Sequence, residues 1–132
     1  ILDTKIILRF LANDHPEHSA KAKSFFGQAV SGDVILHLSP IVLAECVYVL
    51  KGKLYQLTRN EIADLLTKLL EIQGIISQEK DVLFLALSIF AKYNVDFPDA
   101  YLAAKSEFES KAIATFNNKD FDKIGVNSIG PS

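Results

Sequence analysis

Glu45 is the residue whose surroundings point most directly to chemistry. It is the only charged residue between Pro40 and Leu50, a stretch made almost entirely of apolar side chains. A helix that is apolar nearly all round is expected to be largely buried, and an unpaired carboxylate inside it costs several kcal/mol. We therefore expect Glu45 to meet a cation, a pocket or water. The alternatives are a narrow strip of helix facing solvent and a pairing with a distant lysine.

Further polar positions follow predicted strands or open predicted helices. Asp3 closes a short apolar segment, Asp99 lies in the first turn of a helix, and Asn117 and Asp120 follow a strand at 112–116. Each acid also has an ordinary role, because aspartate caps helices at strand-to-helix junctions and acids favour the first helical turn. Several acids at such positions are less easily explained by helix capping alone than a single acid would be.

The chemistry of such a group depends on where the strands end. In open α/β sheets, ligands bind beyond the carboxyl ends of the strands, so Asp3, Asp99 and Asn117 are expected at one edge. Carboxylates gathered there repel one another unless a cation lies between them. Ligands that are all oxygen suit Mg²⁺ or Mn²⁺ rather than zinc. The spacing therefore predicts a divalent metal site.

Short apolar strands alternate with amphipathic helices along the chain. A capping box at Thr58–Glu61 begins one helix, and Gly74 is predicted to end it. The strands are expected at 1–3, 34–38, 75–76 and 112–116, and the helices at 5–11, 16–30, 40–50, 59–73, 82–93 and from Pro98 onward. This alternation predicts an α/β fold in three layers, with a parallel sheet between helices.

Composition narrows the class of protein. The length of 132 residues predicts a single domain, and a net charge of −2 argues against a protein that coats duplexes by electrostatics alone. No apolar run approaches the roughly 18 residues that cross a bilayer. The lone Cys46 cannot form an internal disulfide, which favours a reducing compartment such as the cytoplasm. The mean hydropathy of +0.20 suggests an apolar oligomer surface.

The motifs, taken in order, resemble the PIN domain and most closely its VapC-type toxin branch. The resemblance runs from Ile1 to about Ile124, and it rests on Ile1–Thr4, Arg9–Leu11, Asp14–Pro16, Leu38–Glu45, Val47–Leu50, Val95–Ala104, Ala114–Asn117 and Lys119–Phe121. It implies an α/β/α sandwich with a central parallel sheet of about five strands. It also implies Mg²⁺- or Mn²⁺-dependent cleavage of RNA, a homodimer, and neutralisation by a small antitoxin protein.

The resemblance places Asp3, Glu45 and Asp99 on three of the family's acidic metal-site positions. The family's fourth acid is replaced here by Asn117, which offers only a neutral carbonyl oxygen or orients a water. Asp120 is a nearby carboxylate that compensates as a metal ligand in the same hypothesis. This departure removes one negative charge from the site.

Lys5 is a second departure, because the family has an asparagine at this position. Lys5 either pairs with Asp3 and weakens metal binding or contacts a substrate phosphate. Arg9 is also expected to contact a substrate phosphate. Ser39 and Thr115 are expected to donate hydrogen bonds at the rim. In the predicted mechanism the bound metal lowers the pKa of a water and stabilises charge on the phosphate.

Two rival interpretations remain open. The first is a PIN-like module that binds RNA or protein without cutting, which Asn117 and Lys5 support. The second is a phosphoryl-transfer protein with Asp3 as acceptor, but the residues after Asp3 supply no second acid. His15 and His18 have the spacing of a metal-binding pair, yet they lack a third ligand and are better explained as polar residues at a helix start.

Overall fold

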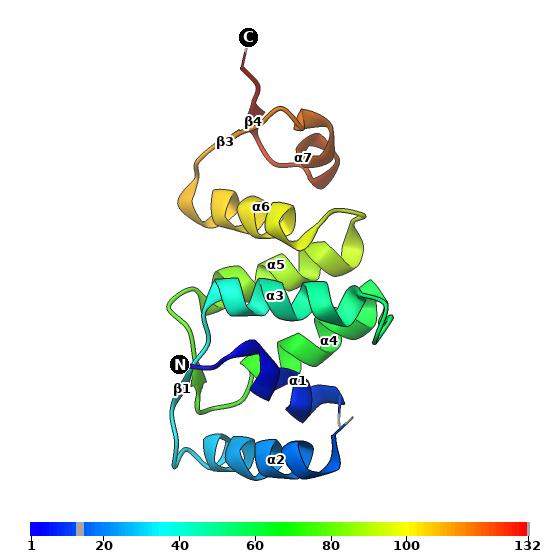
Figure 1. Ribbon diagram of the computed structural model, residues 1–132. Coiled ribbons are helices and arrows are strands. Elements are labelled where there is room, and N and C mark those ends of the chain that lie inside the picture. Colours follow the sequence, from blue (N-terminus) through cyan, green and yellow to red (C-terminus); the bar gives the residue numbers. More distant parts are fainter. Residues whose placement is uncertain (13–14, 132) are drawn as a thin grey trace. The chain divides into compact units, whose positions relative to one another are not determined.

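The computed structural model describes residues 1–12 and 15–131. They group into two compact units, unit 1 (Ile1–Lys80) and unit 2 (Asp81–Ser132), whose elements are labelled in Figure 1. Unit 1 holds α1 (Thr4–Ala12), α2 (Pro16–Val30), β1 (Leu36–His37), α3 (Pro40–Lys51), α4 (Arg59–Leu70) and β2 (Ile75–Ile76). The remaining elements are α5 (Lys80–Lys92), α6 (Phe97–Glu109), β3 (Ile113–Ala114), α7 (Asn118–Ile124) and β4 (Ser128–Ile129). The single domain expected from the length of the chain stays a prediction.

Local capping explains where the helices of unit 1 begin. The Ser39 hydroxyl accepts a hydrogen bond from the Ile41 amide at 3.1 Å, immediately before the proline at the first position of α3. At α4, Thr58 Oγ1 accepts from the Glu61 amide at 3.2 Å, and Glu61 Oε1 accepts from the Thr58 amide at 3.0 Å. This reciprocal pair satisfies two amides that the helix itself leaves without partners. The predicted capping box is confirmed.

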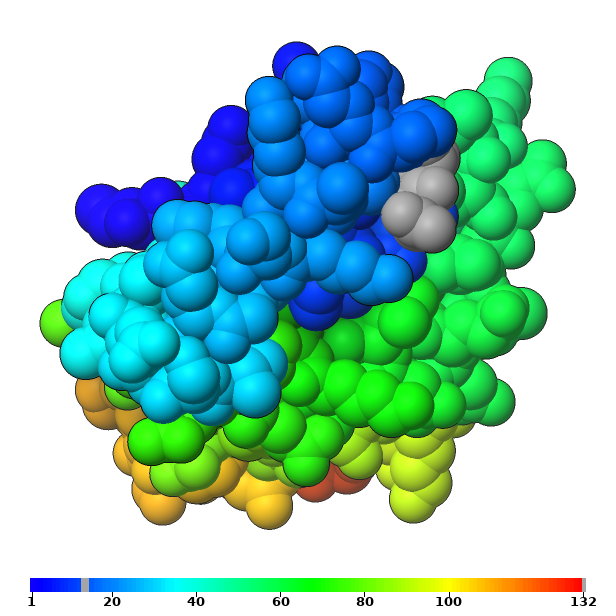
Figure 2. Space-filling view, turned by 90° about the horizontal axis from the view of Figure 1, so that it is seen from below, coloured from blue at the N-terminus to red at the C-terminus, as the bar shows by residue number. Residues whose placement is uncertain are grey.

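Aromatic packing joins α1 to α2. The rings of Phe10 and Phe26 stack with centroids 4.3 Å apart, and Phe25 meets Phe26 edge-on at 6.4 Å. Phe26 is fully buried, as is Ile7 on α1. Figure 2 shows the outer surface of α2, with atoms of the N-terminal segment visible beside it. The two helices therefore form a fixed pair on the surface of unit 1.

The parallel pair β1 and β2 depends on a glycine. Leu36 is registered with Ile75 and His37 with Ile76. Just before β2, Gly74 donates its amide to the Ala29 carbonyl at 2.9 Å and accepts from the Leu36 amide at 2.7 Å. A Cβ at Gly74 would overlap the carbonyl oxygens of Val34 and Ala29. Only glycine lets the end of α2 and the start of β1 approach the chain this closely.

Unit 2 is built around a second parallel pair. Ile113 of β3 is registered with Ser128 of β4, and α7 lies in the chain between them. Ser110 is the C-cap of α6, and its φ of 55° places it in the left-handed region. Phe121 is the buried residue of α7. Sequence reasoning predicted neither α7 nor β4.

Several predictions need correction. The segment 1–3 is not a strand, although the Leu2 amide donates to the His37 carbonyl at 2.8 Å beside β1. Helix α4 ends at Leu70 with Glu71 as its cap, so Gly74 does not terminate it. The α/β class is confirmed in its coarse form, as helices with short parallel strands. Within the described residues the strands form two separate pairs, and the central sheet of about five strands remains a prediction. Across the same ranges, no helix has the length and apolar character needed to cross a membrane.

Candidate functional site

Asp3 and Glu45 act on the same buried atom in unit 1. Asp3 lies directly before α1, where its Oδ1 accepts a hydrogen bond from the Thr4 amide at 2.8 Å. Glu45 lies on α3 beside the buried Cys46. Burial, and after it the charges of Glu45 and Asp3, raise the pKa of the Cys46 thiol to about 12. Two carboxylates from separate elements are therefore close enough to share one electrostatic neighbourhood.

Glu45 is exposed, so the prediction that it is buried is wrong. On the same helix face Ile41 and Tyr48 are 79% and 80% exposed, and these side chains with Glu45 form a strip facing solvent. Burial therefore does not force a cation onto Glu45, and the alternative of a solvent-facing strip describes its surroundings. What supports a functional role is that its charge and that of Asp3 both act on the Cys46 thiol. Within residues 1–12 and 15–131, the Glu45 carboxylate has no hydrogen bond or ion pair.

Asp99 belongs to a cluster of acids in unit 2. It is half-buried in the first turn of α6, and Asp96 is the N-cap of the same helix. Partial burial is the largest cause that raises the pKa of Asp99, followed by the charges of Asp96 and Asp120. The raised pKa means that the Asp99 carboxyl group holds its proton more tightly than an exposed aspartate does. Asp96, which lies within the Val95–Ala104 motif, was not predicted as a member of this cluster.

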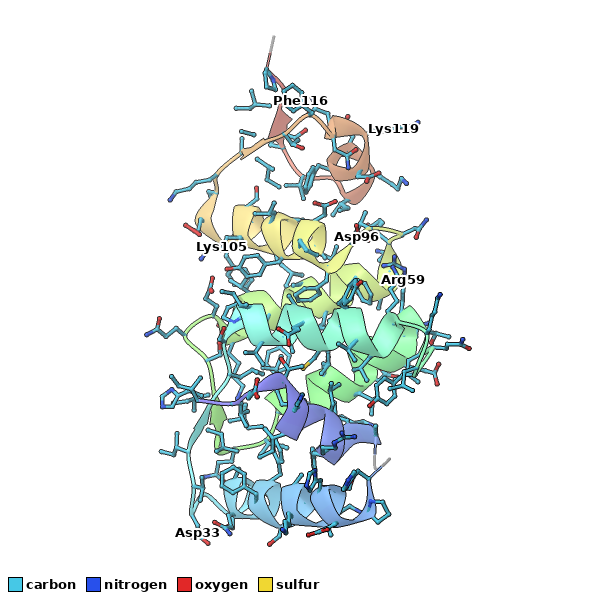
Figure 3. The ribbon with its side chains drawn as sticks, viewed as in Figure 1. Asp33, Arg59, Asp96, Lys105, Phe116 and Lys119 are labelled. Atoms are coloured by element: carbon cyan, nitrogen blue, oxygen red, sulfur yellow. The ribbon has the colours of Figure 1, made fainter. Side chains whose placement is uncertain are left out.

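Asn117 and Asp120 are joined directly. Asn117 Nδ2 donates to Asp120 Oδ2 at 2.7 Å, and Lys123 Nζ lies 4.0 Å from Asp120 Oδ1. The backbone amide of Asn117 donates to Thr115 Oγ1 at 2.9 Å, which fixes the turn after β3. Phe116 and Lys119 are labelled in this turn and the following helix (Figure 3). Asn117, which the resemblance places at the position of the family's fourth acid, therefore binds the nearby carboxylate predicted to compensate for it.

The side-chain chemistry of the predicted ligands suits a hard divalent cation. Aspartate and glutamate oxygens are the ligands that Mg²⁺ and Mn²⁺ prefer. In the part of the chain that the structure describes, no group of three or more histidine, cysteine, aspartate or glutamate side chains is arranged to hold a metal ion. The predicted ligand set therefore remains a prediction.

The other predicted residues have defined places. The Ser39 hydroxyl caps α3, so its observed role is structural. Lys5 is exposed and Arg9 half-buried on α1. The buried hydroxyl of Thr4 has no hydrogen-bond partner among the described atoms, and sequence reasoning gave no reason to single it out. Asp14, part of one motif, lies outside the described residues.

The two histidines have the structural role favoured over metal binding. His15 is the N-cap of α2, and its Nδ1 accepts from the His18 amide at 3.2 Å. The two rings stack with centroids 4.1 Å apart. Because Nδ1 of His15 is already used by the backbone, the pair acts at the helix start as polar capping residues.

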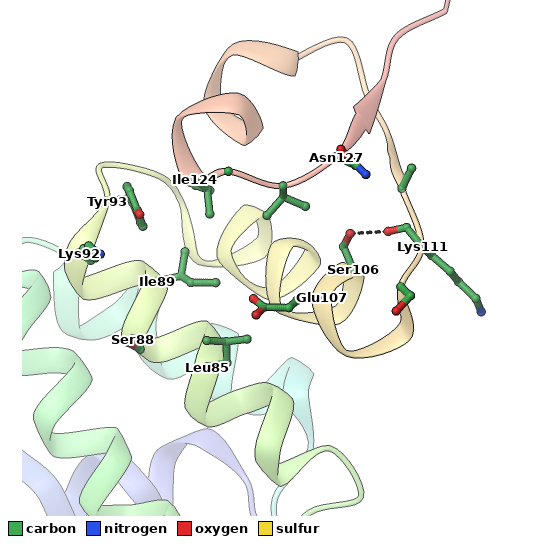
Figure 4. A pocket seen from close by; sticks show the side chains of 14 residues that line it. Leu85, Ser88, Ile89, Lys92, Tyr93, Ser106, Glu107, Lys111, Ile124 and Asn127 are labelled. Atoms are coloured by element: carbon green, nitrogen blue, oxygen red, sulfur yellow. Dashed lines mark hydrogen bonds between the residues drawn. The ribbon is translucent and has the colours of Figure 1, made fainter.

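A hollow of about 730 Å³ lies within unit 2, away from these acids. Figure 4 shows it between α5, the C-terminal part of α6 and the segment 124–127, where the Ser106 hydroxyl donates to the Lys111 carbonyl. Its lining mixes charged side chains (Lys92, Glu107 and Lys111) with serine, asparagine and apolar side chains, and it does not include the predicted metal-site residues. It is therefore not the candidate site.

The profile of the PIN domain family matches residues 1–127, across both units. The chain belongs to the PIN domain family. PIN domains are commonly metal-dependent nucleases, which assigns the chain to the nucleases at a coarse level. No curated protein matches the chain. No solved structure matches it either.

Proposed function

We propose that this PIN domain is a Mg²⁺- or Mn²⁺-dependent endoribonuclease that hydrolyses RNA phosphodiester bonds. The observation that carries the proposal is the family match over residues 1–127, which includes Asp3, Glu45, Asp99 and Asn117. The charges of Asp3 and Glu45 on the Cys46 thiol in unit 1, and the charge of Asp120 on Asp99 in unit 2, support it from each unit separately. The proposed fold is that of the family, with one parallel sheet of about five strands.

In this proposal Asp3 and Asp99 would hold the metal directly, and Glu45 would hold it or orient its water. Such a metal would supply a nucleophilic water at neutral pH and stabilise charge on the phosphate. Asn117 keeps Asp120 in place through its amide, and Asp120 is the additional carboxylate near the ion. Lys5 and Arg9 hold substrate phosphates. The Ser39 and Thr115 hydroxyls would donate hydrogen bonds to the substrate. Each accepts a hydrogen bond from a backbone amide and keeps its own hydrogen to donate.

The biological setting that we propose is the one implied by the VapC-type branch. The chain is a cytoplasmic toxin, it forms a homodimer, and a small antitoxin protein neutralises it. The exposed apolar side chains of Ile41, Tyr48 and Phe116, at 79%, 80% and 91%, are consistent with contacts to other chains.

A second candidate function is a PIN module that binds RNA or protein without cutting. The observation that favours it is the engagement of Asp120 by Asn117 at 2.7 Å and by Lys123 at 4.0 Å. These contacts occupy the Asp120 carboxylate and partly neutralise its charge, in a site where the resemblance already predicts the loss of the family's fourth acid. Calorimetric titration with Mn²⁺ separates the two candidates, because a module without a metal site shows no specific ion binding.

The nuclease proposal predicts that Asp3→Asn abolishes Mn²⁺-stimulated RNA cleavage. Loss of one direct ligand should lower the rate by roughly 100-fold or more, since even residues that only orient ligands cost about 10- to 100-fold. The assay follows cleavage of a labelled RNA with and without Mn²⁺. Asp64→Asn, at an exposed acid of α4, makes the same charge change outside the motifs and should keep full activity. Undiminished cleavage by Asp3→Asn would show that the mechanism is wrong.

A further inference from the structure

A basic groove of about 570 Å³ lies between α1 and α2 in unit 1. The residues that line it are Lys5, Ile6, Arg9, His18, Lys21, Ala22 and Phe25. Its volume lies in the range of sites that bind small organic molecules, roughly 300–1,000 Å³. The chain as a whole carries a net charge of −2, so the concentration of cationic side chains in this one groove is a local feature.

Helical spacing explains why these side chains meet. Lys5 and Arg9 are four residues apart on α1, about 6 Å along the helix axis, and therefore share a face. On α2, His18, Lys21 and Phe25 share a face in the same way, because they follow the i, i+3, i+7 pattern. The two helices thus place cations on both sides of one groove.

The groove also has an apolar lining, part of which is held in place by aromatic packing. Phe25 is half-buried, and its ring meets Phe26 edge-on at 6.4 Å. Phe26 in turn stacks on Phe10 of α1 at 4.3 Å. A positively charged groove with a fixed aromatic ring is the arrangement that binds single-stranded nucleic acid, with phosphates on the cations and a base against the ring.

Glu17 is an acid of α2 that pairs with a lysine of the groove. Glu17 Oε1 lies 3.3 Å from Lys21 Nζ, and both side chains are 73% exposed. An ion pair this exposed contributes little stability, about 0–1 kcal/mol. Lys21 can therefore exchange its partner for a phosphate at small cost.

We infer that the groove between α1 and α2 binds the sugar-phosphate backbone of single-stranded RNA that flanks the cleaved bond. This inference rests on the proposed ribonuclease function and extends it, because Asp3 immediately precedes α1 and Lys5 lies in the first turn of that helix. The RNA strand runs from the N-terminal end of α1, beside Asp3, along Lys5 and Arg9. Lys21 lies on the opposite side of the groove, and Phe25 packs against a base.

The inference predicts which substitutions change RNA binding when no cleavage is possible. Binding of a fluorescein-labelled oligouridylate to the full chain is measured by anisotropy in EDTA, over a series of salt concentrations. Lys5→Ala and Lys21→Ala should each weaken binding several-fold and lower the slope of log affinity against log salt by about 0.7, the value for one contact to a single strand. Phe25→Leu should weaken binding without changing the slope.

Two variants of α2 serve as controls. Lys23→Ala removes an exposed charge that does not line the groove and should leave affinity and slope unchanged. Glu17→Gln should strengthen binding, because it releases Lys21 from its ion pair. Circular dichroism of each variant verifies that the helices remain folded.

The outcomes separate this inference from the nuclease proposal. If the wild type binds oligouridylate through Lys5 and Lys21 but never cleaves RNA with Mn²⁺, the groove is correct and the nuclease proposal is wrong. If the wild type cleaves RNA while Lys5→Ala and Lys21→Ala bind it unchanged, the groove inference is overturned. Absence of oligouridylate binding by the wild type, or binding of an acidic peptide in its place, also overturns it.

Discussion

Asn117 is the residue at which the resemblance to the family predicts a lost negative charge in the candidate site. Its amide holds Asp120 at 2.7 Å, a distance at which two carboxylates would repel each other strongly. An aspartate at this position therefore tolerates Asp120 only when a cation is bound. Amide and acid have nearly the same shape, so the substitution changes charge with little change in packing.

We expect Asn117→Asp to raise Mn²⁺ affinity and RNA cleavage by roughly 10-fold, since each additional charged ligand contributes on the scale of a charge-assisted contact, about 1.5 kcal/mol. A metal-dependent cleavage assay beside the wild type measures the change. Asn127→Asp adds the same charge at an exposed position outside the acidic cluster and should have no effect. Equal rates for wild type and Asn117→Asp would contradict an eroded metal site.

Asp99 makes stability depend on pH in a predictable direction. Because its pKa is raised above the ordinary 3.8, the folded chain holds the Asp99 proton more tightly than the unfolded chain does. The Asp99 contribution therefore lowers stability as pH rises from 3.8 through the raised pKa, and its full cost remains above that window.

Without metal, Asp99→Asn should be more stable than the wild type at pH 7, by roughly 0.5 kcal/mol for partly exposed charges. The difference should shrink toward pH 4, where the wild-type carboxyl gains its proton. Urea unfolding between pH 4 and pH 7 measures both. Added Mn²⁺ should stabilise the wild type and not the variant, and a difference that is independent of pH would show that charge at Asp99 is not the cause.

At the scale of elements, Gly74 controls how the end of α2, β1 and β2 fit together. Gly74→Ala should destabilise the chain by roughly 2–3 kcal/mol, as overpacking does, because its Cβ would overlap two backbone carbonyls that cannot rotate away. Gly27→Ala is a matched control within α2, since its Cβ meets nothing within 4 Å. It should stabilise the chain by roughly 0.5–1 kcal/mol through helix propensity. Equal urea midpoints for the two variants would contradict the tight crossing at Gly74.

Elements that carry their own local signals were predictable from the sequence. Helices α3 and α4 follow from Pro40 after a serine cap and from the Thr58–Glu61 capping box, which act within a few residues. Helix α7 was missed because it is seven residues long and Phe121 is its only buried residue, too little for a recognisable period. The pairing of β3 with β4 depends on contacts distant in sequence, which local patterns do not specify.

The candidate site was predictable in its residue types and less so in its surroundings. The acids at positions 3, 45 and 99 can be singled out by type and spacing, and their role as metal ligands stays a prediction. The exposure of Glu45 does not follow, because a helix that is apolar all round gives no indication of which face lacks a covering element. Asp96 was missed because an acid at a helix N-cap has an ordinary explanation.

At the scale of the whole molecule, the surface exposes large apolar side chains that a lone monomer would leave in water. Ile41, Tyr48 and Leu54 are each about 80% exposed, and Phe116 is 91% exposed. Light scattering at micromolar concentration should therefore give twice the mass of one chain. High salt should leave that mass unchanged, because apolar contacts are not screened. A single-chain mass throughout would contradict the homodimer.

The buried Cys46 thiol also provides a way to measure how often α3 opens. With a pKa of about 12 and no exposed surface, Cys46 holds almost no thiolate at neutral pH. Alkylating reagents therefore react with it only after α3 opens. Since the chain has a single cysteine, the labelling rate reports that opening alone. An ion held by the two neighbouring carboxylates would slow it, giving a readout of occupancy that needs neither RNA nor turnover.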